Sequence, residues 1–220
     1  MAGETIAILG GTGDLGTGLA IRWAKAGHGI IIGSRTQQKA DAAVAELKKI
    51  SPSTPARAMV NPDAAAAGDI VVLTVPSEHQ LSTLESVRAG LQGKILIDVT
   101  VPLVPPKVGT VQLPAEGSAG KRAQNFLGDD VRVVTAFQNV AAHLLQRDVT
   151  IECDVLVCGN KKDARDRVIE LIREAGMRGF HAGPIENSAA AEALTSVLIQ
   201  INRQGEIAHS GIKIVGQGDH

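Results

Sequence analysis

The sequence is poor in aromatic residues. Phe, Trp and Tyr together make up 2% of the 220 residues, and tyrosine is absent. A surface that binds nucleic-acid bases usually stacks them on aromatic side chains, and this chain offers almost none. The formal net charge is −1, so the chain also lacks the excess of basic residues that attracts a polyanion. We therefore expect no nucleic-acid partner.

Cysteine and long apolar runs are scarce as well. The two cysteines, Cys153 and Cys158, do not have the spacing of a CxxC pair, and no second pair completes a zinc site. We expect reduced core thiols and no metal site. No run of 18 apolar residues is present, and the start of the chain lacks the basic and long apolar segments of a secretory signal. These absences favour a cytoplasmic protein with no membrane partner.

Short apolar runs alternate with helical patterns through the first half of the chain. Residues 5–9, 29–33, 69–75 and 94–99 are predicted strands, and residues 37–50 give one of the helices between them. Buried parallel strands typically read as continuous apolar runs, as residues 69–75 do. The alternation predicts an α/β fold with a doubly wound parallel sheet of the Rossmann type.

The pattern changes after residue 100. Residues 100–117 contain four prolines and are predicted to form a loop. A smaller unit then follows from residue 150, with two short strands, a helix between them and a long apolar-rich helix over residues 186–204. We expect residues 1–149 to form a dinucleotide-binding domain and residues 150–220 to form a small C-terminal α/β domain.

A glycine-rich loop follows the first predicted strand and opens the first helix. Gly11, Gly13 and Gly16 have GxGxxG spacing, with Thr12, Asp14 and Leu15 between them. In this context the glycines permit a tight turn, a close approach of the backbone to a pyrophosphate, and close packing of helix on strand. The helix N-terminus supplies free N–H groups for the phosphates. The loop predicts a dinucleotide site.

The end of the second predicted strand indicates which dinucleotide is bound. An NAD site usually carries an acidic residue there, but this chain has Ser34 and Arg35, and no Asp or Glu before Asp41. Ser34 can donate a hydrogen bond to a 2′-phosphate, Arg35 can pair with it, and Lys39 can add a second positive charge. The residues therefore favour NADP(H).

The fourth predicted strand is followed by Thr74, Val75 and Pro76, with His79 in the next helical turn. Strand ends of this fold face the ligand crevice, so these residues are expected beside the nicotinamide half. His79 is a weak candidate for a proton donor. With no tyrosine, the chain lacks the Ser-Tyr-x-x-x-Lys arrangement of alcohol-oxidising short-chain enzymes. We assign no catalytic side chain, because hydride transfer between two redox coenzymes needs orientation alone.

The chain resembles the NADPH-dependent coenzyme F420 reductases over nearly its whole length. The segments that carry the resemblance are residues 6–16, 26–28, 32–35, 74–79, 153–159, 182–188 and 211–213. The resemblance implies reversible hydride transfer between NADP(H) and coenzyme F420, an 8-hydroxy-5-deazaflavin. It also implies that the glycine loop, Ser34, Arg35 and Lys39 contact NADP, with Val75 and His79 by the nicotinamide half.

The resemblance further implies a deazaflavin pocket built from three later segments. The matching positions are Val101, Pro102, Gln138, Asn139, Val140, Ala142 and Ser210. The chain departs from the family at two positions. Gln138 stands where an archaeal member has His, and Ala141 stands where that member has Pro. Gln138 keeps hydrogen bonding but has no acid–base capacity.

Two other functions remain open from the residues. One is an NADPH-dependent reductase for a flavin, a ferric chelate or an imine, using the same nucleotide half. The other is a non-catalytic NADP-sensing module, in which the proline-rich loop would contact a protein partner. The long apolar helix over residues 189–201 is expected to need a partner surface on which to pack. Together with the family resemblance, this helix favours a homodimer.

Overall fold

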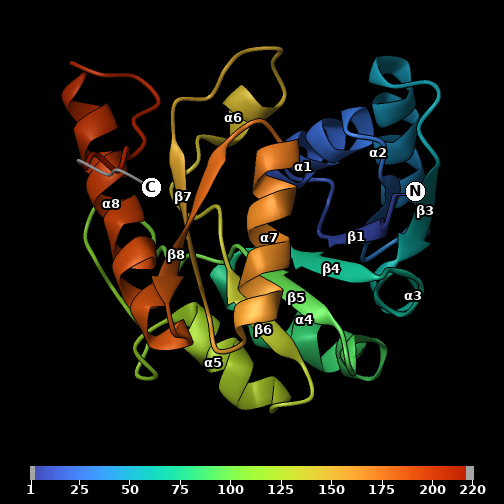
Figure 1. Cartoon of the computed structure of the whole chain (residues 1–220), viewed down its shortest axis with the longest axis horizontal. Helices are drawn as coiled ribbons and strands as arrows, with labels where there is room; N and C mark the ends of the chain where they lie inside the picture. The colour runs from blue at the N-terminus through green and yellow to red at the C-terminus, as the bar shows by residue number, and fades with distance from the viewer. Residues whose placement is uncertain (1–2, 217–220) are drawn as a thin grey trace.

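The computed structural model describes residues 3–216, which build a single eight-stranded sheet with helices on both faces (Figure 1). The strands are β1 (Thr5–Leu9), β2 (Gly29–Ser34), β3 (Ala56–Val60), β4 (Ile70–Leu73), β5 (Ile95–Asp98), β6 (Arg132–Thr135), β7 (Asp154–Gly159) and β8 (Arg178–Gly183). The helices are α1 (Asp14–Lys25), α2 (Gln37–Ile50), α3 (Asn61–Ala67), α4 (Gln80–Val87), α5 (Ala119–Leu127), α6 (Ala142–Leu145), α7 (Lys162–Glu174) and α8 (Ser188–Gln204).

The sheet has the order β3-β2-β1-β4-β5-β6-β7-β8, and its first six strands are parallel. This arrangement confirms the predicted doubly wound sheet. The strand order reverses between β1 and β4, so the ligand crevice of such a fold is expected at their carboxyl ends. β7 runs antiparallel to β6, and β8 runs parallel to β7. The sheet thus continues across residue 150 without interruption.

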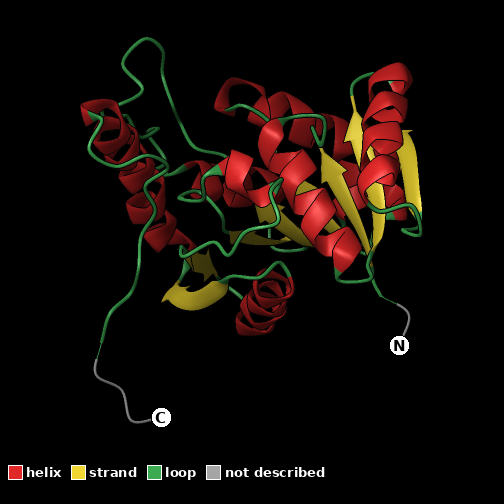
Figure 2. Ribbon diagram, turned by 90° about the horizontal axis from the view of Figure 1, so that it is seen from above, coloured by secondary structure: helices red, strands yellow, loops and turns green. Residues whose placement is uncertain are grey.

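Alternate residues of the central strands face two separate cores. Ile6 and Ile8 pack with α1, α2 and α7 on one face, whereas Ala7 and Leu9 pack with α3, α4 and α5 on the other. Figure 2 shows helices on both sides of the strands. Both faces of β1 are therefore buried, which explains why it reads as a continuous apolar run.

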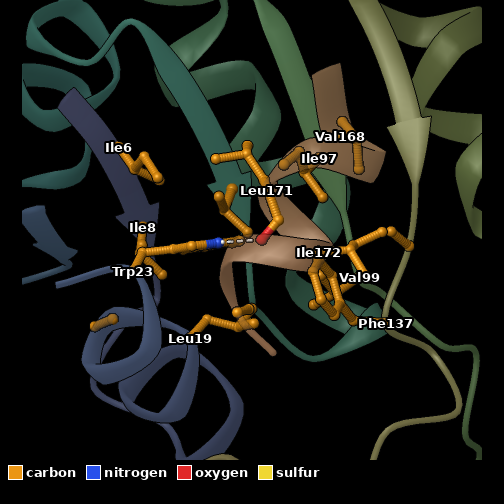
Figure 3. Packing of buried hydrophobic residues seen from close by; sticks show 14 of the residues in the cluster. Ile6, Ile8, Leu19, Trp23, Ile97, Val99, Phe137, Val168, Leu171 and Ile172 are labelled. Carbon is orange, nitrogen blue, oxygen red and sulfur yellow. Dashed lines mark hydrogen bonds between the residues drawn. The ribbon is translucent and has the colours of Figure 1, made fainter. Parts of the chain in front are cut away.

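Trp23 links the two halves of the chain within the first core (Figure 3). Its Nε1 donates a hydrogen bond to the Leu171 carbonyl at 2.9 Å, from α1 to α7. Its ring meets Phe137 edge-on, with centroids 5.9 Å apart. The chain's sole tryptophan is thus satisfied in the core, where a buried indole N–H needs a partner.

The helical segment after β4 consists of three pieces. A 3-10 turn over Ser77–His79 precedes α4, and a second 3-10 turn over Arg88–Leu91 ends it. Cys153 and Cys158 are free and buried, as expected. No helix among residues 3–216 is long and apolar enough to cross a bilayer.

Candidate functional site

A hollow of about 300 Å³ opens at the carboxyl ends of β1, β2 and β4, where the strand order reverses. Most residues predicted to contact NADP meet there, although they come from three separate segments. Its lining comprises Gly10, Thr12, Gly13, Ser34, Arg35, Lys39, Asn61, Thr74, Val75, Pro76, His79, Ser82 and Thr83.

The glycine loop brings backbone rather than side chains to this hollow. Gly10 has φ +73°, and a Cβ on Gly16 would lie 2.7 Å from Gly11 Cα and 2.8 Å from Thr74 Oγ1. Helix α1 can therefore approach β1 and β4 only with glycine at these positions. The helix starts at Asp14, and no side chain caps it. Its first N–H groups remain available for an anion.

The other predicted residues of the loop lie around the hollow without lining it. Gly11 is buried beneath the turn, where its N–H reaches the Gly33 carbonyl at 3.2 Å. Asp14 is exposed at the first position of α1, and Leu15 packs partly against the core. These three positions contribute to the shape of the loop and to the N-terminus of the helix.

One end of the hollow is basic. Ser34 is 4% exposed at the end of β2, while Arg35 and Lys39 extend into solvent beside it. No Asp or Glu belongs to the lining of this hollow. A carboxylate that would repel a 2′-phosphate is thus missing, and two cations that would attract one are present.

The opposite end is formed by the turn after β4. Thr74 Oγ1 donates a hydrogen bond to the Leu9 carbonyl at 2.8 Å, which fixes the strand end. Val75 is half-buried there, and Pro76 and His79 are exposed at the rim. The four positions predicted beside the nicotinamide half therefore lie together.

Two side chains that the sequence did not single out hold this turn in place. Arg122 of α5 donates from Nε to Gln80 Oε1 at 2.8 Å and from Nη2 to the Ser77 carbonyl at 3.3 Å. Gln80 is fully buried, and its Nε2 donates to Asp98 Oδ2 at 2.5 Å. The turn that carries His79 is thus tied to the end of β5.

Two buried carboxyl groups lie behind this turn. Burial raises the pKa of Asp98 above its usual range. Burial also raises the pKa of Glu192 to about 7, helped by the nearby charge of Asp98 and opposed by two backbone hydrogen bonds. Those bonds come from the N–H groups of Ala119 (2.7 Å) and Gly120 (3.0 Å). Glu192 therefore fastens α8 to the N-terminus of α5.

A second, smaller hollow of about 140 Å³ lies between the segment after β6 and α8. Four of the positions implied for the deazaflavin line it, namely Gln138, Asn139, Val140 and Ser210. The remaining lining residues are Ala141, Thr195, Leu198, Ile199 and Asn202. The other three implied positions are not in this lining: Val101 and Pro102 lie in the loop after β5, and Ala142 begins α6.

Hydrogen bonds fix the side chains of this second hollow. Gln138 Nε2 donates to the Asp98 carbonyl at 3.0 Å, while its buried Oε1 has no partner among residues 3–216. Asn139 Nδ2 donates to the Ala191 carbonyl at 2.8 Å. Gln138 can therefore still accept one hydrogen bond, whereas Asn139 holds α8 in position.

The two hollows lie along one edge of the sheet. Backbone hydrogen bonds at that edge run from Thr74 N–H to the Leu9 carbonyl, from Val99 N–H to the Leu73 carbonyl, and from Ala136 N–H to the Asp98 carbonyl. The first hollow lies at β2, β1 and β4, and the second lies just beyond β6. Two strand spacings, about 10 Å in all, separate β4 from β6.

Comparison with known proteins gives a consistent result. Residues 5–102 match the family described as NADP oxidoreductase, coenzyme F420-dependent. The chain is 41% identical to the F420-dependent NADP reductase of Methanocaldococcus jannaschii, covering 95% of this chain and 97% of the relative. It is 40% identical to the F420-dependent NADP reductase of Methanothermobacter thermautotrophicus, covering 95% and 94%.

A solved structure agrees over nearly the full length. The crystal structure of an Arthrobacter sp. FB24 protein, itself proposed to be an F420-dependent NADP reductase, superposes with a TM-score of 0.82. The two sequences are 27% identical, and the match covers 97% of this chain and all of the other. The similarity therefore includes the C-terminal part as well as the dinucleotide-binding half.

Proposed function

The chain belongs to the family of F420-dependent NADP reductases, and we propose that it exchanges a hydride reversibly between NADP(H) and coenzyme F420 in the crevice described above. The observation that carries this proposal is the pair of hollows on one sheet edge. The first has the shape and charge for a 2′-phosphorylated dinucleotide. The second lies within reach of its nicotinamide end.

We propose that NADP(H) lies across the carboxyl ends of β2, β1 and β4. Its pyrophosphate would meet the free N–H groups of the loop from Gly11 to Leu15. Ser34, Arg35 and Lys39 would hold the 2′-phosphate, with charge-assisted hydrogen bonds from the two cations. Thr74, Val75, Pro76 and His79 would border the nicotinamide half.

We propose that the deazaflavin ring occupies the side of the crevice beyond β5 and β6, against Val101, Pro102, Gln138, Asn139, Val140, Ala142 and Ser210. The coenzymes supply the chemistry: a hydride carries both electrons from C4 of the nicotinamide to C5 of the deazaflavin, and solvent supplies the balancing proton. The chain orients the two rings, whose reacting carbons must come to roughly 3–3.5 Å. Gln138, whose Nε2 donates to the Asp98 carbonyl at 3.0 Å, would border the ring from the second hollow.

The residues around the reacting carbons need no acid or base. Pro76, Val101, Pro102 and Val140 would form apolar walls that keep water from the hydride path. Residues 150–220 would complete the deazaflavin side through α8 and Ser210, which line the second hollow with Gln138 and Asn139. The buried free thiols of Cys153 and Cys158 support a reducing, cytoplasmic location.

We also propose a homodimer. Val197 and Ile201 lie one turn apart on α8 and are 44% and 38% exposed. The proline-rich loop lies beside this helix, because a Cβ on Gly109 would come within 2.9 Å of Gln200 Oε1. The loop adds the exposed apolar side chains of Val104 and Val111. Such a combined apolar surface is typical of an interface between subunits.

The proposal is tested by following absorbance at 420 nm with purified protein, NADPH and oxidised coenzyme F420. Loss of the deazaflavin absorbance, with NADH much slower, is the expected result. Parallel reactions with FMN, FAD and a ferric chelate test the other reductase chemistry. NADPH binding without turnover of any acceptor would favour the sensing module instead.

A further inference from the structure

An irregular segment over residues 209–214, here called the C-terminal strap, runs from α8 to the start of β7. Its first residue, His209, packs against His143 of α6, with ring centroids 3.7 Å apart. Ser210 follows and lines the second hollow. The Ser210 N–H donates to Asn202 Oδ1 at 2.8 Å, and its Oγ donates to a backbone carbonyl of α8 at 3.1 Å. These contacts fix the end of the strap that lies at the hollow.

The other end of the strap is bound by a single residue, Asp154, at the start of β7. The Asp154 N–H donates to the Ile212 carbonyl at 2.8 Å. Its Oδ2 accepts a hydrogen bond from the Ile214 N–H at 2.6 Å. β6 pairs with the opposite end of β7, at Cys158 and Gly159. Asp154 therefore joins the strap to the sheet through one main-chain and one side-chain hydrogen bond.

The Asp154 carboxylate is prepared for this contact by Arg178 of β8. Arg178 Nε donates to Oδ1 at 2.8 Å, and its Nη2 donates to Oδ2 at 2.7 Å. These hydrogen bonds hold the pKa of Asp154 below its usual range, although the residue is only 3% exposed. An ionised acceptor forms stronger hydrogen bonds than a neutral one. The bond to the Ile214 N–H is therefore charge-assisted.

The middle of the strap passes very close to the residue before β7. A Cβ on Gly211 would lie 2.8 Å from Cys153 Sγ and 3.0 Å from Cys153 Cβ. The φ angle of Gly211 is outside the left-handed region, so space and not conformation requires glycine there. Cys153 Sγ also donates to the Asn139 carbonyl at 3.5 Å, and Asn139 lines the second hollow. The position of the strap is thus coupled to that wall.

We propose that Asp154 is a positioning residue for coenzyme F420, because it holds the strap so that Ser210 stays in the wall of the second hollow. The inference rests on the proposed function for the ligand of that hollow. Asp154 lines neither hollow, so it acts through the strap alone. If the strap is released, only part of the molecules present a complete wall, and the apparent affinity falls with that fraction. The first hollow, at β2, β1 and β4, does not contact the strap.

The test compares the dissociation constants of coenzyme F420 and NADPH by calorimetric titration. Asp154→Ala removes the acceptor of the Ile214 N–H and should weaken coenzyme F420 by about tenfold, with NADPH unchanged. Asp154→Asn retains one oxygen that can accept this N–H, so it should recover most of the affinity. Asp163→Ala is the matched control, because it removes an exposed Asp–Arg pair, with Arg132 at 3.3 Å, away from both hollows.

A second variant displaces the strap without removing a buried charge. Gly211→Ala should also weaken coenzyme F420 and leave NADPH unchanged, because its Cβ would collide with Cys153. Gly216→Ala is its control, since a Cβ there meets nothing within 4 Å. Hydrogen exchange measured by mass spectrometry should show faster exchange of the backbone amides of residues 209–214 in Asp154→Ala and Gly211→Ala than in the wild-type protein.

The outcomes separate this inference from the proposed function. A wild-type protein that reduces coenzyme F420 and an Asp154→Ala variant that binds it equally well would overturn the inference alone. Equal weakening of both coenzymes would also overturn it, because that pattern indicates a general loss of structure. Binding of coenzyme F420 that depends on Asp154, without hydride transfer, would uphold the inference and reject the proposed function. A wild-type protein that does not bind coenzyme F420 would overturn both.

Discussion

At the scale of single residues, we expect the choice of dinucleotide to depend on charge at the end of β2. Arg35 and Lys39 are exposed and belong to a lining without acidic residues. We expect Arg35→Ala to weaken NADPH by roughly 10–100-fold, since a charge-assisted contact to phosphate is lost. NADH, which lacks that phosphate, should be affected little. Titration of both dinucleotides by fluorescence measures the difference.

Arg57→Ala is the matched control, because Arg57 is exposed on β3 and is not in the lining of the hollow. It should leave both affinities unchanged. If Arg35→Ala weakened NADH and NADPH equally, the assignment of the phosphate contact would fail.

Residue spacing predicted one wall of the first hollow well and another poorly. The glycine loop, the Ser34–Arg35 pair and the positions after β4 each follow a strand immediately, so parallel strands bring them to one edge. Asn61 was missed because an Asn before a proline is typical of any helix start. Arg122 was missed because its partners, Ser77 and Gln80, are more than 40 residues away in the chain.

At the scale of elements, the contact between α5 and α8 contains a titrating group. The carboxyl of Glu192 has its pKa raised to about 7 in the fold, above the 4.5 of a free side chain. The folded state then holds a proton more tightly than the unfolded state. The stability from this group is complete below about pH 4.5 and is lost as pH rises through about 7.

We therefore expect the free energy of unfolding of the wild-type protein to fall, relative to that of Glu192→Gln, as pH rises from 5 to 8. The shift corresponds to about 3 kcal/mol at most. Asp98, whose pKa is also raised, acts in the same direction, and His143, whose pKa is lowered by burial, acts oppositely. His143 is present in both proteins, so its contribution cancels, and the difference between the two urea denaturation curves reports Glu192 together with its electrostatic coupling to Asp98. A pH-independent difference would contradict the raised pKa.

The sequence predicted the existence of elements better than their directions. The bounds of strands β1 and β2 and helix α2 were predicted to within one residue. In each of these segments the spacing of the apolar residues and the length of the segment indicate the same kind of element. The antiparallel pairing of β7 with β6 was not predicted. The connection between them contains only the one-turn helix α6, and apolar runs carry no information on strand direction.

At the scale of the whole molecule, the exposed face of α8 and the adjoining loop predict association. We expect the wild-type protein to sediment as a dimer and Ile201→Glu to shift it toward monomer, since a charge would be buried at the interface. Ile50→Glu, at an apolar position at the end of α2 that is 50% exposed, is the control. A wild-type protein that sediments as a monomer at micromolar concentration would contradict the proposal.

The whole sheet brings the two proposed coenzyme sites to one edge, with the strand ends between them tied by backbone hydrogen bonds. From this arrangement we propose that the hydride passes directly across the crevice, without a catalytic side chain. Neither hollow alone would accommodate both coenzymes.

A single turnover with NADPH carrying deuterium at both C4 positions distinguishes direct transfer from transfer through the protein. After reaction with oxidised coenzyme F420 in ordinary water, the mass of the reduced deazaflavin is measured. Direct transfer predicts one deuterium per molecule, retained at C5. A reduced product that contains only solvent hydrogen would contradict direct transfer and would require an intermediate carrier on the protein.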